Sequence, residues 1–183
     1  ADKTTAVQVI NANVVAVSVG SNHTCAVMTD QTVQCWGRDD YGQQGDGTSS
    51  MISPNNSPVT VGGVTGAIGI SVNGFHSCAL LTSGAAKCWG ANYDGQLGDG
   101  VNVGGSSATA IDVDGIDNAV GISAGSNHTC AVLNNGTVKC WGDNMSKQGG
   151  RIGLESAIPI LVAGITGATA VIAGAGHACA LIG

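Results

Sequence analysis

The sequence predicts an all-β protein built from repeated four-stranded antiparallel blades, the unit of a β-propeller. Three observations support this fold class. Two motifs recur with a period of about 50 residues, which is typical of propellers, solenoids and arrays. Each period contains short runs of alternating or β-branched apolar residues, separated by Gly or Asn-Gly turns. No segment combines a helical apolar stripe with helix caps.

The two recurring motifs lie on what we expect to be neighbouring strands. In the first motif a His precedes a Cys by two residues, as in Gly20-Ser-Asn-His-Thr-Cys-Ala-Val27. Copies of it occupy residues 20–27, 73–80, 125–132 and 174–181. The second motif is Cys-Trp-Gly, which begins at Cys35, Cys88 and Cys140. Because the second motif follows the first at a constant distance, the two belong to one repeated unit.

Each repeat is predicted to contain four short strands. In the first repeat these are an apolar strand at Val14–Val19, the His-x-Cys strand, the Cys-Trp-Gly strand and an outer strand at Pro58–Val61. The predicted units are an outer strand at 6–9, blades at 14–61, 67–113 and 119–162, and a half-blade at 170–182. Residues 1–183 are therefore expected to form one domain of about 3.5 blades in an incomplete ring.

These motifs resemble those of the regulator of chromosome condensation (RCC1) repeat family. The resemblance rests on the Gly-x-x-His-[Thr/Ser]-Cys-Ala strand, the Cys-Trp-Gly strand and the loops at 36–47 and 89–100, and it covers nearly the whole chain. It implies β-propeller blades, usually seven in a complete ring. The third loop departs from the pattern, because Lys147 stands where the first two loops have Gly42 and Gly95. We expect a different turn in that loop.

Six of the seven cysteines form three equally spaced pairs. In a hairpin with its turn near residue 30, Cys25 and Cys35 lie opposite each other, close enough for a disulfide. The predicted bridges are Cys25–Cys35, Cys78–Cys88 and Cys130–Cys140. Cys179 is left over, so we expect it to be unpaired or bonded to another molecule. The alternative is zinc bound by His and Cys, although each hairpin supplies only three ligands where four are usual.

Charge and composition exclude several classes of protein. The formal net charge is −6 and the 6 basic residues are scattered singly, which speaks against nucleic-acid binding. No apolar run has the length of a membrane span. No catalytic or nucleotide-binding motif is present, so we expect no enzymatic activity, cofactor or metal. Because disulfides persist in oxidising compartments, we expect a secreted or cell-surface protein.

Other repeated side chains have both a structural and a functional interpretation. The four histidines of the first motif form a metal-binding or pH-sensitive ring or, as we expect, anchor each blade by the same hydrogen bond. Trp36, Trp89 and Trp141 are expected to pack between blades. The Asp and Asn residues of the loops suit turns better than a calcium site, because they lack the spacing of the twelve-residue calcium loop.

The incomplete blades predict a protein that acts by self-association. The expected assembly is a closed ring or a fibre whose partner is a second copy of the chain. In it, the strand of Ala6, Val7, Gln8 and Val9 in one copy completes the half-blade edge at Leu181 and Ile182 of another.

Two alternatives to self-association remain open. In one, the chain is an excerpt of a longer seven-bladed propeller. In the other, it is a secreted recognition module, similar to an inhibitor or an adhesin, that binds a foreign protein through its loops. Tyr and Arg are frequent in binding hot spots, so the candidate contact residues are Arg38, Tyr41, Tyr93 and Arg151.

Overall fold

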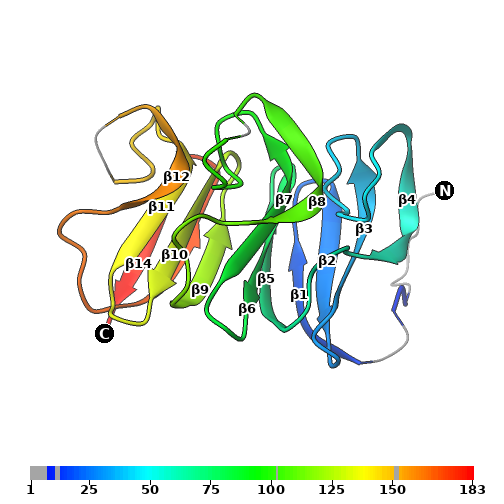
Figure 1. Ribbon diagram of the computed structural model, residues 1–183, viewed down its shortest axis with the longest axis horizontal. Helices are drawn as coiled ribbons and strands as arrows, with labels where there is room; N and C mark the ends of the chain where they lie inside the picture. The colour runs from blue at the N-terminus through cyan, green and yellow to red at the C-terminus, as the bar shows by residue number, and fades with distance from the viewer. Residues whose placement is uncertain (1–7, 11–12, 102, 151–152) are drawn as a thin grey trace.

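The computed structural model describes residues 8–10, 13–101, 103–150 and 153–183, without the side chains of residues 51–55. Within these residues the chain forms fourteen β-strands. The strands make three four-stranded sheets and one two-stranded sheet, which stand side by side in chain order (Figure 1). The predicted all-β class is therefore confirmed. The described part of the chain has no helix of the length and apolarity needed to cross a membrane.

Each sheet is one blade, and its strands follow one another along the chain. The first blade consists of β1 (Val14–Val19), β2 (His23–Met28), β3 (Val33–Asp39) and β4 (Ser50–Thr60). The second consists of β5 (Ala67–Asn73), β6 (His76–Leu81), β7 (Ala86–Asn92) and β8 (Gly105–Asp112). The third consists of β9 (Ala119–Ala124), β10 (His128–Leu133), β11 (Val138–Asp143) and β12 (Glu155–Leu161). The half-blade has β13 (Ala168–Ala173) and β14 (Ala178–Ile182).

The pairing within each blade is antiparallel throughout. The hairpin of β2 and β3 pairs Cys25 with Cys35, and the hairpins β6–β7 and β10–β11 repeat this register. Tight turns at the ends of these hairpins let successive strands pair without crossover connections. Within the described residues the sheets do not close into a ring: the first blade stands at one end and the half-blade at the other (Figure 1).

The outer strand predicted at residues 6–9 does not form a strand in the part that is described. Ala6 and Val7 lie outside the described residues, and Gln8 and Val9 have irregular backbone. The first blade already has four strands with β4 at its outer edge. The open edge of the half-blade lies at the opposite end of the molecule (Figure 1). Gln8 and Val9, the described part of the segment, therefore complete no blade in the same molecule.

The hydrophobic core lies between the blades. Val33 and Val61 of the first blade pack with Trp89 of the second in one cluster. Leu97 of the second blade packs with Trp141 of the third in an equivalent cluster. The cluster between the third blade and the half-blade contains no tryptophan among its described residues. Each blade is thus stabilised mainly by its neighbours, as in other repeat proteins.

Glycine allows the loop of one blade to approach the indole of the next. Gly45 has φ +73°, and a Cβ added to it would lie 2.9 Å from the Trp89 ring. Gly98 has φ +77°, and its added Cβ would lie 2.7 Å from the Trp141 ring. Both the left-handed backbone and the close contact require glycine, which is why a Gly follows the buried side chains of both loops.

Candidate functional site

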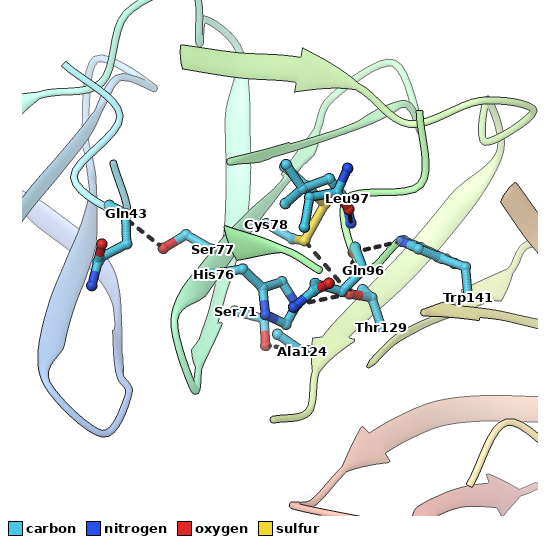
Figure 2. Close-up of a disulfide and its surroundings, with 12 residues drawn as sticks. Gln43, Ser71, His76, Ser77, Cys78, Gln96, Leu97, Ala124, Thr129 and Trp141 are labelled. Atoms are coloured by element: carbon cyan, nitrogen blue, oxygen red, sulfur yellow. Dashed lines mark hydrogen bonds between the residues drawn. A yellow bond between two sulfur atoms is a disulfide. The ribbon is translucent and has the colours of Figure 1, made fainter. Parts of the chain in front are cut away.

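The interfaces between blades contain a repeated polar network. His76 Nε2 hydrogen bonds to Thr129 Oγ1 of the next blade at 2.9 Å, and this hydroxyl donates to the carbonyl of Gln96 at 2.9 Å (Figure 2). The same carbonyl accepts from Trp141 Nε1 at 2.9 Å. One blade earlier, His23 Nε2 contacts Ser77 Oγ at 2.7 Å. The His side chains therefore anchor one blade to the next.

The buried histidines are neutral. Because burial penalises the charged ring, the pKa of His76 is lowered to about 3 and that of His23 to about 4. In the His76 network the hydroxyl donates to a carbonyl, so it accepts from Nε2 and leaves Nδ1 without a proton. This arrangement is structural, and among the described residues no three His, Cys, Asp or Glu side chains converge as metal ligands would.

The expectation that all four histidines make the same bond is wrong for the last two. Ala178 stands where Ser77 and Thr129 carry the hydroxyl, so His128 is buried without that partner. His177 is exposed. The hydrogen bond repeats only where the following blade supplies a Ser or Thr, which a His-x-Cys pattern does not specify.

Six cysteines form disulfides within their hairpins. The bonds join Cys25 to Cys35, Cys78 to Cys88 and Cys130 to Cys140, each with its Cα atoms 4.1 Å apart. These are the pairs named from the sequence. Their sulfurs bond to each other, so they are not thiolate ligands for zinc. Cys179 is a free, exposed cysteine.

The three loops after Cys-Trp-Gly share one turn, so the expected difference in the third loop is wrong. Lys147 adopts the left-handed conformation of Gly42 and Gly95, with φ +58°. Its N–H donates to Asn144 O and its carbonyl accepts from Gly150, as in the other loops. The side chains of Asp39, Asn92 and Asn144 each accept a loop backbone N–H, which is the role of turn residues. The carboxylate of Asp39 therefore accepts a hydrogen bond within its own loop.

Three of the four predicted contact residues lie together on one face. The Tyr41 ring packs edge-on against Phe75 at 5.2 Å and against Tyr93 at 5.6 Å between ring centroids. The guanidinium of Arg38 lies 5.1 Å from the Phe75 centroid. We call these four residues the aromatic patch. Arg151 lies outside the described residues. Phe75 was not predicted, although it is an aromatic residue where the other full copies of the motif have Asn.

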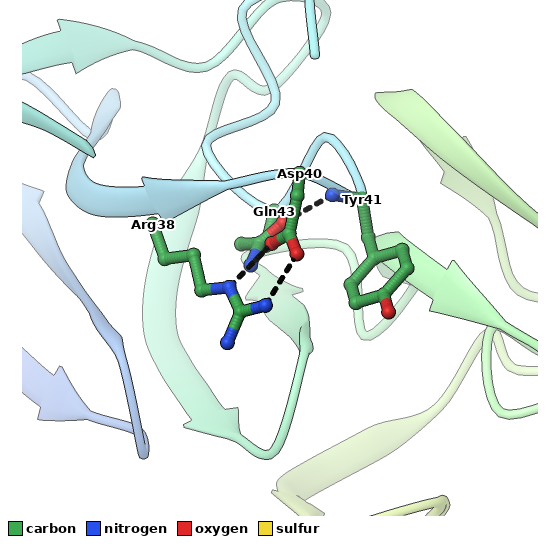
Figure 3. A network of polar contacts seen from close by, with 4 residues as sticks. All are labelled: Arg38, Asp40, Tyr41 and Gln43. Atoms are coloured by element: carbon green, nitrogen blue, oxygen red, sulfur yellow. Dashed lines mark hydrogen bonds and ion pairs between the residues drawn. The ribbon is translucent and has the colours of Figure 1, made fainter. Parts of the chain in front are cut away.

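A polar contact fixes the arginine of the aromatic patch. Arg38 donates two hydrogen bonds to the Asp40 carboxylate, Nε at 2.7 Å and Nη2 at 2.6 Å (Figure 3). Burial alone would raise the pKa of Asp40, but the hydrogen bonds from Arg38 and Gln43 outweigh it and lower the pKa. The paired guanidinium is therefore held in place beside the rings, with its side chain 45% exposed.

The first blade exposes an apolar face that is covered in the later blades. In β1, Val17 is 61% and Val19 is 70% exposed, whereas Val72, the counterpart of Val19 in β5, is 5% exposed. The first blade covers Val72, because β5 packs against β1 and β2. Val14, Val17 and Val19 form what we call the leading face.

The half-blade exposes an apolar face at the other end. Ile172 is 70% and Leu181 is 65% exposed. In the complete blades the position of Ile172 is a serine whose hydroxyl accepts an N–H from the next blade, as Ser71 does from Ala124 at 2.9 Å. Leu181 and Ile182, predicted as assembly residues, lie on this strand pair. We call Ile172 and Leu181, whose side chains point to the same side of the sheet, the trailing face, whereas the side chain of Ile182 points to the opposite side.

Repeated antiparallel blades joined by loop, hydroxyl and indole contacts define a β-propeller repeat protein. The model of the "Regulator of chromosome condensation (RCC1) repeat" matches residues 14–43, 67–96 and 119–148, which run from the first strand of each blade into its loop. The chain thus contains three RCC1 repeats and belongs to the RCC1 repeat family, which confirms the resemblance seen in the sequence.

Individual proteins of similar sequence or structure support this family assignment. The Regulator of chromosome condensation of Drosophila melanogaster is 34% identical over 113 residues, 62% of this chain and 20% of that protein. Human WBSCR16 has a similar structure, with a TM-score of 0.80 and 24% identity over 93% of this chain and 44% of that one. Prp20p from Saccharomyces cerevisiae has a TM-score of 0.76 and 19% identity over 89% and 42%. This chain therefore spans less than half of each of these proteins.

The buried histidines predict a loss of stability in acid. In the unfolded chain His76 takes up a proton below about pH 6.5, whereas in the native protein it stays neutral until about pH 3. The free energy of unfolding is therefore unaffected by this histidine above pH 6.5. Below that pH it falls by about 1.4 kcal/mol per pH unit for each such histidine. In urea unfolding between pH 7 and 4, His76→Gln should reduce this slope by about that amount.

The matched control for this prediction is His177→Gln, because His177 is exposed. It should leave the pH slope of the unfolding free energy unchanged. An unaltered slope in His76→Gln would show that the ring is protonated in the native protein or that its network does not form.

Proposed function

We propose that this chain is an extracellular, non-enzymatic interaction protein that self-associates by stacking the leading face of one copy on the trailing face of another. The observation that carries the proposal is the exposure of Val17 and Val19, because the equivalent surface of the later blades is covered by a neighbouring blade. A second copy would supply that neighbour.

The two faces suit each other chemically. Both faces are apolar. Valines form the leading face, and Ile172 and Leu181 form the trailing face. Ile172 replaces the serine that bonds the next blade in the interior, so this contact would rest on apolar burial instead of a hydrogen bond. A contact between two different faces is heterologous and yields a ring if its rotation closes and a filament if it does not.

The extracellular assignment is supported by the disulfides. Each of the hairpins β2–β3, β6–β7 and β10–β11 carries a disulfide. Such bonds persist in oxidising compartments. The non-enzymatic assignment is supported by the roles of the buried polar side chains. The histidines join blades, and the Asp and Asn side chains fix turns.

Sedimentation velocity tests self-association of the 183-residue chain. The wild type should form species larger than 17.9 kDa as its concentration rises. A Val17→Lys, Val19→Lys variant should shift the association constant at least tenfold toward the monomer, because two charges would be buried at the contact. Ile172→Lys should do the same from the other side.

The control is Val120→Lys, which changes a 57% exposed valine on the third blade, away from both faces. It should associate like the wild type. A wild-type chain that stays monomeric at all concentrations, or a control as defective as the face variants, would contradict stacking through these faces.

The aromatic patch supports a second function, recognition of a foreign protein. Tyr and Arg are, with Trp, enriched in binding hot spots, and here Tyr93 is 50% exposed beside Tyr41, Phe75 and Arg38. Burial and the charges of Asp143 and Glu155 raise the pKa of Asp94, next to Tyr93, so the surroundings carry negative charge. A cationic partner surface would complement them. The yeast Prp20p structure is described together with binding to Gsp1p and histones, which shows that a related propeller binds proteins.

Peptide selection tests recognition by the aromatic patch. Peptides enriched from a random library on the wild-type chain should carry Lys or Arg and should bind Tyr93→Ala at least tenfold more weakly. Met145→Ala, which changes a 76% exposed side chain in the third loop, is the matched control and should bind them normally. Equal binding to all three proteins would exclude the patch as the contact.

A further inference from the structure

A cavity of about 180 Å³ opens between the third blade and the half-blade. Val138, Val162, Ile165 and Val171 give it apolar walls, and Gln148 and Gly150 of the third loop also line it. The exposed Cys179 lies on its lining as well. The strand that lines the cavity therefore also carries a free thiol, on the side opposite to Ala178 and Ala180.

The equivalent position in the other two interfaces holds an indole. Trp89 and Trp141 are fully buried there, and their Nε1 groups donate to the carbonyls of Gln43 and Gln96. A Cβ added to Gly45 or Gly98 would meet these rings, whereas one added to Gly150 would meet only Val162. Since the third loop has the same turn, the cavity has the walls of an indole site.

The edge of β14 has the pairing position of a Cys-Trp-Gly strand. β2, β6 and β10 each pair with such a strand, but within the described residues β14 pairs only with β13. In the complete hairpins the cysteines lie opposite each other, and Ser77 and Thr129 lie opposite a tryptophan. By this register, Cys179 would face a partner cysteine and Ala178 would face the following tryptophan.

We infer that the edge of β14 binds an extended segment of the pattern apolar-x-Cys-Trp-Gly from outside residues 1–183, with its indole in the cavity. The three segments of this kind within residues 1–183, on β3, β7 and β11, are already paired and bridged, so the occupant is a segment from outside these residues. The added strand satisfies the open backbone edge, and the indole fills the apolar walls. The carbonyl of Gln148 is the equivalent acceptor for its N–H.

Cys179 can then hold the segment covalently by thiol–disulfide exchange. The Cys179 thiolate attacks the cysteine sulfur of a segment that carries a small thiol as a mixed disulfide. A new S–S bond forms between Cys179 and the segment, the mixed disulfide breaks and the small thiol leaves as a thiolate. No external oxidant is consumed, because one disulfide replaces another.

The test uses a synthetic peptide with the sequence of Val138–Asp143, Val-Lys-Cys-Trp-Gly-Asp, bearing glutathione on its cysteine. Mass spectrometry follows the adduct of the 17.9 kDa chain over time. Capture should be at least tenfold faster than with a peptide in which the tryptophan is replaced by alanine, and Cys179→Ser should form no adduct. Equal rates for the two peptides would show that Cys179 reacts only as an accessible thiol and would overturn the inference.

Two protein variants separate the cavity from the thiol. Ala178→Phe adds bulk beside the cavity and should slow capture of the tryptophan peptide to the rate of the alanine peptide. Val120→Phe adds the same bulk on the third blade and should leave the rate unchanged. An unaffected rate in Ala178→Phe would also overturn the inference.

This inference does not require the stacking proposed above. Sedimentation of the same preparations reports on stacking separately, because the leading and trailing faces are not altered by Ala178→Phe. Selective capture by a strictly monomeric chain would therefore support the cavity while contradicting self-association.

Discussion

The structure depends on the contact between the loop of one blade and the indole of the next blade, which are buried together between two sheets. The carbonyl of Gln43 or Gln96 accepts from the indole, and a Ser or Thr hydroxyl links it to a histidine. A buried carbonyl or indole N–H without such a partner would cost about 1–3 kcal/mol. The network therefore fixes the distance and orientation of successive blades while the surrounding valines and leucines supply the apolar burial.

Because stability comes from neighbours, the two ends of the array differ from its interior. The first blade exposes valines that a preceding blade would cover, and the half-blade exposes Ile172 and Leu181. At the same end, the third loop provides an indole site without an indole. The proposed stacking and the proposed strand capture thus rest on one principle, which is that each interface is completed by groups from the following blade.

The sequence was sufficient for the fold and for much of the site. The period, the His-x-Cys and Cys-Trp-Gly spacing and the hairpin register identified the blades and the facing cysteines. It was insufficient where a contact depends on another blade. Lys147 keeps a left-handed turn because the Asn144 and Gln148 side chains hold that loop, and His128 lacks a bond because its partner position is Ala178. Phe75 joins Tyr41 and Tyr93 only once two blades stack.

The most direct test of this account compares alanine substitutions at the three repeated tryptophans by urea unfolding. Trp89 and Trp141 are fully buried between blades, whereas Trp36 carries the same motif on the first blade and is only half-buried. Trp89→Ala and Trp141→Ala should each lower the free energy of unfolding by about 3–5 kcal/mol, and Trp36→Ala by less than half of that. Equal losses at all three positions would contradict the claim that the indole acts by joining one blade to the next.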